Sequence, residues 1–119
     1  MNKDDLKDRT KKFALEIITL VDTFPKNNVG FVIGKQLIRS ATSVGANYRS
    51  ACRAKSRADF IAKLGTVEEE SDETIYWLEI VLDANIADFE KTKKLLKEAN
   101  ELTAIFTKSK ITAKTKERK

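Results

Sequence analysis

The clearest pattern of apolar and polar positions lies in residues 56–84 and predicts a long amphipathic helix. Apolar or small residues recur there at alternating separations of four and three positions, which is typical of a helix packed in a bundle. Ser56 and Asp59 match the start of a capping box, and Asn85 suits the end of the helix. The predicted seam consists of Phe60, Leu64, Val67, Ser71, Thr74, Leu78 and Val81.

Similar spacing elsewhere predicts three further helices, so that the four lie at about 4–24, 29–54, 57–84 and 89–106. Pro25 ends the first helix because the residue before a proline avoids helical geometry, and Asn27 or Asn28 can cap the second. Long helices with short connections predict an all-α fold, an antiparallel up-down-up-down four-helix bundle that forms one domain over residues 1–106. The basic segment 107–119 is expected to be a flexible tail.

The second predicted helix is unusually rich in small residues, among them Gly34 and Gly45. Each glycine in a helix interior costs up to ~1 kcal/mol relative to alanine, so we expect close packing to compensate. A tight helix crossing is favoured over a ligand pocket. Arg39 lies in the same segment, and we expect its guanidinium to be paired internally, because a buried cation requires a carboxylate.

Charge is distributed unevenly along the chain, which has a net charge of +5. Residues 26–57 hold seven basic groups and no acid, whereas residues 58–90 hold ten acids and one basic group. Residues 91–119 are basic again, with ten basic groups and three acids. This segregation favours neighbouring helices of opposite charge, and it also leaves basic surface for an anionic partner.

Composition limits the compartment and the chemistry. No apolar run approaches the roughly 18 residues of a membrane span, and the charged N-terminal segment lacks the apolar core of a secretory signal. We therefore expect a cytoplasmic protein with no membrane partner. The chain has no histidine, and its single cysteine, Cys52, has no imidazole to activate it. Glu69, Glu70 and Glu73 lack a second carboxylate helix with which to hold a metal, so we expect no enzyme activity, cofactor or metal.

Two interpretations of the basic residues remain open. In the first, the basic side chains neutralise phosphates. In the second, the basic side chains of residues 35–57 pair with the acids of residues 68–79 on the neighbouring helix. Tyr48 is the one aromatic residue between Lys35 and Arg57, so any nucleic-acid binding should be mainly electrostatic and weakly sequence-specific. The candidate phosphate contacts are Lys35, Arg49, Arg53, Lys55, Arg57, Lys108, Lys110, Lys114, Lys116, Arg118 and Lys119.

Residues 36–80 resemble the central motif of a known family, the four helix bundle protein family, also called the S23 or ribosomal-RNA intervening-sequence protein family. The resemblance is carried by RSATSVGAN at residues 39–47, RADF at 57–60 and WLE at 77–79, in this order. Flanking helices extend it over nearly the whole chain. One departure is Ser50, where the family usually has Glu, so an ion pair made by that Glu would be absent here. A structural role is expected for the polar residues Arg39, Asn47, Asp59, Glu70 and Glu73.

The resemblance implies a ring-like homopentamer and a link to nucleic acid. Members are encoded within large-subunit ribosomal RNA genes or by ordinary chromosomal genes of bacteria. A similar protein is the basic accessory subunit of diversity-generating retroelements, which associates with a reverse transcriptase and nucleic acid. Most members have no established activity.

We therefore expect a non-enzymatic homo-oligomeric bundle that binds RNA or DNA with low specificity, or that accompanies a nucleic-acid enzyme such as a reverse transcriptase. The alternative is a protein-interaction scaffold with no direct nucleic-acid binding. Tyr76 and Trp77 are adjacent and cannot both face the seam, so they are the candidate residues of a subunit interface.

Overall fold

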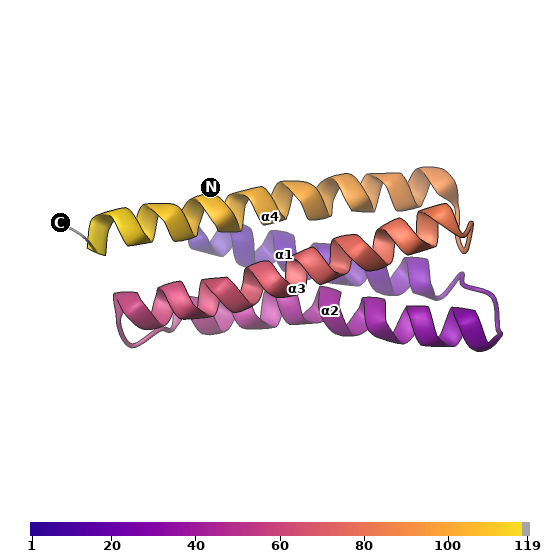
Figure 1. Cartoon of the computed structure of the whole chain (residues 1–119), viewed down its shortest axis with the longest axis horizontal. Helices are drawn as coiled ribbons and strands as arrows, with labels where there is room; N and C mark the ends of the chain where they lie inside the picture. Colours follow the sequence, from indigo (N-terminus) through magenta and orange to yellow (C-terminus); the bar gives the residue numbers. More distant parts are fainter. Residues whose placement is uncertain (118–119) are drawn as a thin grey trace.

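The computed structural model of the chain describes residues 1–117 and contains no strand within them. Those residues form four helices, α1 (Lys3–Val21), α2 (Asn28–Cys52), α3 (Arg57–Asp83) and α4 (Phe89–Glu117), which lie along one long axis (Figure 1). The predicted all-α class is confirmed. None of the four helices is long and apolar enough to cross a bilayer.

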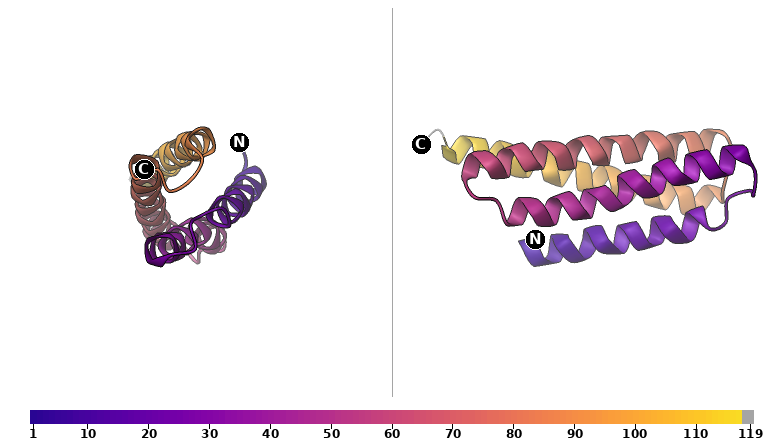
Figure 2. Two further views of the ribbon diagram at one scale, coloured as in Figure 1. Left: turned by 90° about the vertical axis from the view of Figure 1, so that its right-hand side faces the viewer. Right: turned by 90° about the horizontal axis from the view of Figure 1, so that it is seen from below.

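The order of the helices around the bundle is seen end-on in Figure 2. Neighbours in sequence pack against each other, and α1 and α4 face each other across the more open side. Arg9 of α1 ties that side together, because its guanidinium donates to both carboxylate oxygens of Glu98 in α4, at 2.7 and 2.6 Å. Such a bidentate pair adds geometric precision where apolar packing is thinner.

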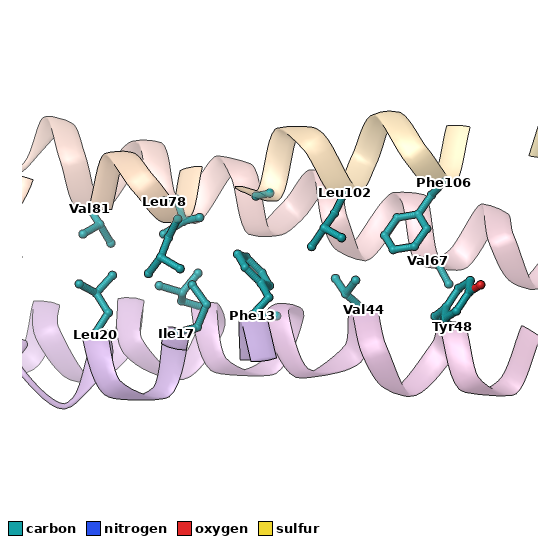
Figure 3. Close-up of a cluster of buried hydrophobic side chains, with 14 of the residues drawn as sticks. Phe13, Ile17, Leu20, Val44, Tyr48, Val67, Leu78, Val81, Leu102 and Phe106 are labelled. Carbon is teal, nitrogen blue, oxygen red and sulfur yellow. The ribbon is translucent and has the colours of Figure 1, made fainter. Parts of the chain in front are cut away.

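The core follows the predicted stripes (Figure 3). Six of the seven predicted seam positions of α3 are buried, and Phe60 is half-buried at the helix start. The two polar seam residues have partners on both neighbouring helices. Thr74 donates to Ser40 of α2 at 2.9 Å, and Ser71 shares a short hydrogen bond with Thr103 of α4. These hydroxyls lie in the core at little cost because they are hydrogen-bonded.

The helix ends agree with the capping signals, and the main difference is at α4. Asn27 accepts from the Gly30 backbone N–H at 2.9 Å, and Asn85 has a positive φ of 54°. The first two helices end two or three residues before the expected positions. The expected end of the last helix at residue 106 was wrong, because α4 continues through Glu117. Ala113 is buried in this extension, so part of the predicted tail is helix with a packed face.

The glycines of α2 mark its close approach to α1. A Cβ on Gly34 would lie 2.8 Å from a methyl group of Val21, and one on Gly45 would lie 3.2 Å from the hydroxyl of Thr10. The small residues therefore serve a tight helix crossing, as the sequence favoured. Gly30 is more constrained, because its Cβ would lie 2.0 Å from the carbonyl oxygen of Pro25.

Two glycine substitutions should consequently have opposite effects on stability. Gly30→Ala forces the turn before α2 to move, and we expect a loss of about 1–3 kcal/mol in the free energy of unfolding. Gly65 in α3 has no neighbouring atom within 4 Å of an added Cβ, so Gly65→Ala should gain about 0.5–1 kcal/mol from helix propensity. Urea denaturation measures both. Equal stability of the two variants would contradict the close contact at Gly30.

Candidate nucleic-acid interface

Four predicted phosphate contacts meet at the turn between α2 and α3. Arg49 lies in the last turn of α2, Arg53 follows its final residue, Lys55 is in the turn and Arg57 begins α3. The local fold depends on Ser56, whose hydroxyl accepts from the Asp59 backbone N–H at 3.1 Å and starts α3. All four cations are exposed. None forms an ion pair within the part of the chain that the structure describes.

The end of α4 adds cations beside this turn (Figure 1). Lys108 and Lys116 line the same cavity as Arg57, and Lys114 is exposed. We call the eight residues Lys3, Arg49, Arg53, Lys55, Arg57, Lys108, Lys114 and Lys116 the basic end of the bundle. The predicted contacts Arg118 and Lys119 lie outside the described residues.

Two predicted phosphate contacts do not belong to the basic end. Lys35 is exposed, but it lies 14 positions before Arg49 in α2, which is about 21 Å along a helix. Lys110 is half-buried, and its ammonium pairs with Oε1 of Glu68 in α3. Thr107 donates to the other oxygen of Glu68 at 2.7 Å. Lys110 therefore fixes the extension of α4 to α3.

Arg39 has the predicted carboxylate partners but not the predicted burial. Its guanidinium lies 3.2 Å from Oε2 of Glu70 and also pairs with Oε1 of Glu73, while 46% of its side chain remains exposed. A half-exposed guanidinium retains much of its hydration, so this ion pair joins the surfaces of α2 and α3 rather than compensating a buried charge. The hydrogen bond from Arg39, with a second from Trp77, lowers the pKa of Glu73.

The other predicted polar residues act locally. Asn47 donates from its amide to the Ser43 carbonyl at 2.8 Å, within its own helix. Asp59 accepts from the Lys55 backbone N–H at 3.1 Å and from the Lys63 ammonium at 2.9 Å. The hydrogen bond from Lys63, followed by that from Lys55, lowers the pKa of Asp59. Both residues stabilise local helix structure, and Asp59 also places a carboxylate at the turn beside Lys55.

Tyr76 and Trp77, the predicted interface pair, differ in exposure, as expected for adjacent residues of a helix. Tyr76 is 54% exposed, whereas Trp77 is half-buried and donates to Glu73 at 3.3 Å. Their rings form an edge-on pair with centroids 5.1 Å apart. Sequence reasoning missed Lys3, because only the fold brings its side chain to α3, where the Lys3 ammonium lies 5.2 Å from the ring centroid of Phe60.

Comparison with known proteins gives the family of the chain. The family model described as 23S rRNA-intervening sequence protein matches residues 3–108. The chain belongs to this family. A similar crystal structure is that of a protein with unknown function from the S23 ribosomal protein family of Bacteroides thetaiotaomicron. It is 34% identical, with a TM-score of 0.84 over 92% of this chain and 98% of the other. No match was found among curated proteins.

Membership of the 23S rRNA-intervening sequence protein family confirms the resemblance seen in the sequence. The family match ends at residue 108, within α4. Most of the extension that carries Lys110, Lys114 and Lys116 therefore follows the matched segment, and it is held to α3 by Lys110 and Thr107.

The ion pair that fixes this extension should contribute to stability in a pH-dependent way. Burial raises the pKa of Glu68, but the bonds from Lys110 and Thr107 outweigh it, so the pKa lies below its ordinary value. A lowered carboxyl pKa stabilises the fold above the unfolded-state pKa of about 4.3, and this stability is lost as pH falls through the folded-state pKa. Lys110→Met should thus cost about 1–3 kcal/mol at pH 7.

Urea denaturation of the wild-type protein and Lys110→Met near pH 7 and pH 3 measures this contribution. The difference between the two proteins should shrink at the lower pH, because the stability that the lowered pKa of Glu68 contributes is lost as pH falls. Lys97→Met serves as the control, because Lys97 is an exposed residue of α4 outside the ion pairs of the described residues, and its loss should change stability by less than about 0.5 kcal/mol. A pH-independent loss in Lys110→Met would contradict the assigned role of Glu68.

Proposed function

We propose that the protein is a non-enzymatic, antiparallel helical bundle that assembles into a ring-like homo-oligomer and binds RNA or DNA through its basic end with low sequence specificity. The observation that carries this proposal is the exposed, unpaired state of Arg49, Arg53, Lys55 and Arg57 within the described residues. Phosphates are the partners that such a cationic cluster favours, and the release of their counterions drives the binding.

The distribution of ion pairs favours this function over internal neutralisation. Of the acids of α3, Glu70 and Glu73 pair with Arg39, and Glu68 pairs with Lys110. Neither Arg39 nor Lys110 is one of the residues of the basic end. Within the described residues no acid of α3 forms an ion pair with the basic end, so most of its positive charge remains available. Its proposed partner in the cytoplasm is a nucleic acid or a nucleoprotein complex, such as one containing a reverse transcriptase.

Repetition of the basic end strengthens the proposal. A single bundle offers few phosphate contacts, and each contact on its own is weak. In a ring, every copy presents the same cluster, so a polyanion that engages several copies gains avidity without any new type of contact. Low specificity per subunit is thus compatible with useful affinity for a long nucleic acid.

Apolar surface far from the basic end supports the oligomer. Phe31 is 62% exposed and borders a hollow of about 320 Å³ between α1 and α2, together with Ile18 and Ile38. Tyr76 is exposed on α3. Two different apolar surfaces on one chain suit a head-to-tail contact, which closes into a ring when the rotation permits. The same surfaces favour the alternative function, a protein-interaction scaffold, if the basic end binds no nucleic acid.

The dependence of binding on salt separates the two functions. The double variant Arg49→Ala/Arg53→Ala should bind single-stranded or duplex nucleic acid more weakly, with the slope of log K against log salt reduced by roughly 1.4–1.8, because each lost phosphate contact accounts for ~0.7–0.9. Fluorescence anisotropy of a labelled oligonucleotide over a salt series measures the slope. Lys91→Ala/Lys97→Ala removes equal charge from α4 and should leave the slope unchanged. No binding by the wild-type protein at low salt would favour the scaffold.

A separate measurement addresses the oligomer. Phe31→Asp and Tyr76→Asp should each lower the mass observed by sedimentation velocity, because a charge placed in an apolar contact is costly to desolvate. Phe89→Asp provides a matched control at a residue that is 50% exposed and outside both surfaces. A monomeric wild-type protein, or a control that dissociates as readily, would contradict the proposed contact.

A further inference from the structure

A cavity of about 780 Å³ opens at the basic end of the bundle. It lies between the first residues of α1, the end of α2, the start of α3 and the last turns of α4. Its apolar lining is contributed by Ala51, Cys52, Phe60, Ile105 and Ala113. The volume lies in the range of small-molecule sites, which combine an apolar interior with a few polar groups.

The charge of this cavity is of one sign. Lys3, Arg57, Lys108 and Lys116 lie around it, and no aspartate or glutamate is among its lining residues in the described chain. Ser56, Ser109 and Thr112 supply hydroxyl groups. An apolar interior surrounded by cations and hydroxyls suits a ligand with a flat apolar body, hydrogen-bonding edges and a negative charge beside it.

Phe60 provides the surface on which a flat group can stack. Its ring is half-buried, and the Lys3 ammonium lies 5.2 Å from the ring centroid. This cation–π contact is weak at an exposed position. An aromatic ligand can replace the ammonium over the ring, and Lys3 can then pair with a phosphate of the same ligand. The exchange keeps both the ring face and the cation in favourable contacts.

The position of the cavity relates it to the proposed function. Arg57 both lines the cavity and belongs to the cationic turn that carries Arg49 and Arg53. A strand whose phosphates contact that turn can place a base in the cavity beside Phe60, because Arg57 and Phe60 line the same cavity. In a duplex this base is paired and stacked, whereas in a single strand it is free to leave the stack.

We propose that the cavity binds one unpaired base of a single-stranded nucleic acid, with the base stacked on Phe60 and the adjoining phosphates held by Arg57, Lys108 and Lys116. This inference rests on the proposed function and adds to it a preference for single strands over duplexes. The hydroxyl groups that line the cavity can each donate or accept a hydrogen bond and so select no single base, and low sequence specificity is retained.

The test compares Phe60→Leu with the wild-type protein, using a labelled oligothymidine and a duplex of equal length. Leucine keeps the apolar packing but has no aromatic face. Single-strand affinity should fall on the order of 10-fold, as expected for the loss of one base–aromatic stack, while duplex affinity stays unchanged. Phe89→Leu is the matched control, because the ring of Phe89 likewise has a lysine, Lys93, 5.2 Å from its centroid, yet Phe89 lies at the start of α4, away from the basic end.

A second variant keeps the test independent of the packing of Phe60. Thr112→Leu enlarges an exposed lining residue and should produce the same selective loss of single-strand affinity. Equal affinity of the wild-type protein for both oligonucleotides, unchanged by either variant, would overturn the cavity assignment and leave the electrostatic function intact. Decanoate, an apolar anion, serves as a probe of the cavity. If decanoate saturates the cavity but displaces neither oligonucleotide, the cavity assignment is likewise overturned and the electrostatic function is left intact. No binding of either oligonucleotide at low salt would overturn the proposed function itself.

Discussion

The α3 helix buries its seam against α2 and α4 together, and the arrangement of the other helices depends on that contact. Leu64, Val67, Leu78 and Val81 are almost completely removed from water. Each fully buried side chain of this size contributes about 1.5–3 kcal/mol. The polar seam residues hold α3 against the same two helices, since Thr74 is hydrogen-bonded to α2 and Ser71 to α4. With α2 fixed in this way, its glycines determine how closely α1 can approach.

The same contact determines which charges remain available. On one side of the α3 seam, Glu70 and Glu73 meet Arg39 of α2, and on the other side Glu68 meets Lys110 of α4. These ion pairs join the helix surfaces, and they involve acids of α3 that lie next to α2 and α4. Arg49 in the last turn of α2 and Arg53 just after its final residue form no ion pair with these acids, so their charges remain in solvent. The exposed basic surface therefore depends on which residues of neighbouring helices lie opposite one another, as well as on the composition of the chain.

Most of the fold was predictable because the relevant signals are local and periodic. The spacing of Leu64, Val67 and Leu78 defines a buried stripe without knowledge of its partners, and Asn27 or Ser56 identifies a helix start through its own backbone. The end of α4 was not predictable in this way. Residues 107–117 carry little apolar surface, and their helix is held by Ala113 and by the contact of Lys110 with Glu68. Arg39 was expected to be buried but is half-exposed. Its burial depends on how the neighbouring helix packs against it, which the sequence of one helix does not reveal.

The cavity at the basic end follows from unequal helix lengths. Helix α4 has 29 residues and α1 has 19, so α4 continues past the point where α1 begins (Figure 1). The extension of α4 is held to α3 through Lys110 and Thr107, and the place that a longer α1 would fill is bordered by Lys3, Phe60 and Ala113. An end left open in this way exposes an aromatic face of the seam beside cations that the bundle does not neutralise. The fold thus brings an apolar surface and a positive field together at the residues where a nucleic acid is proposed to bind.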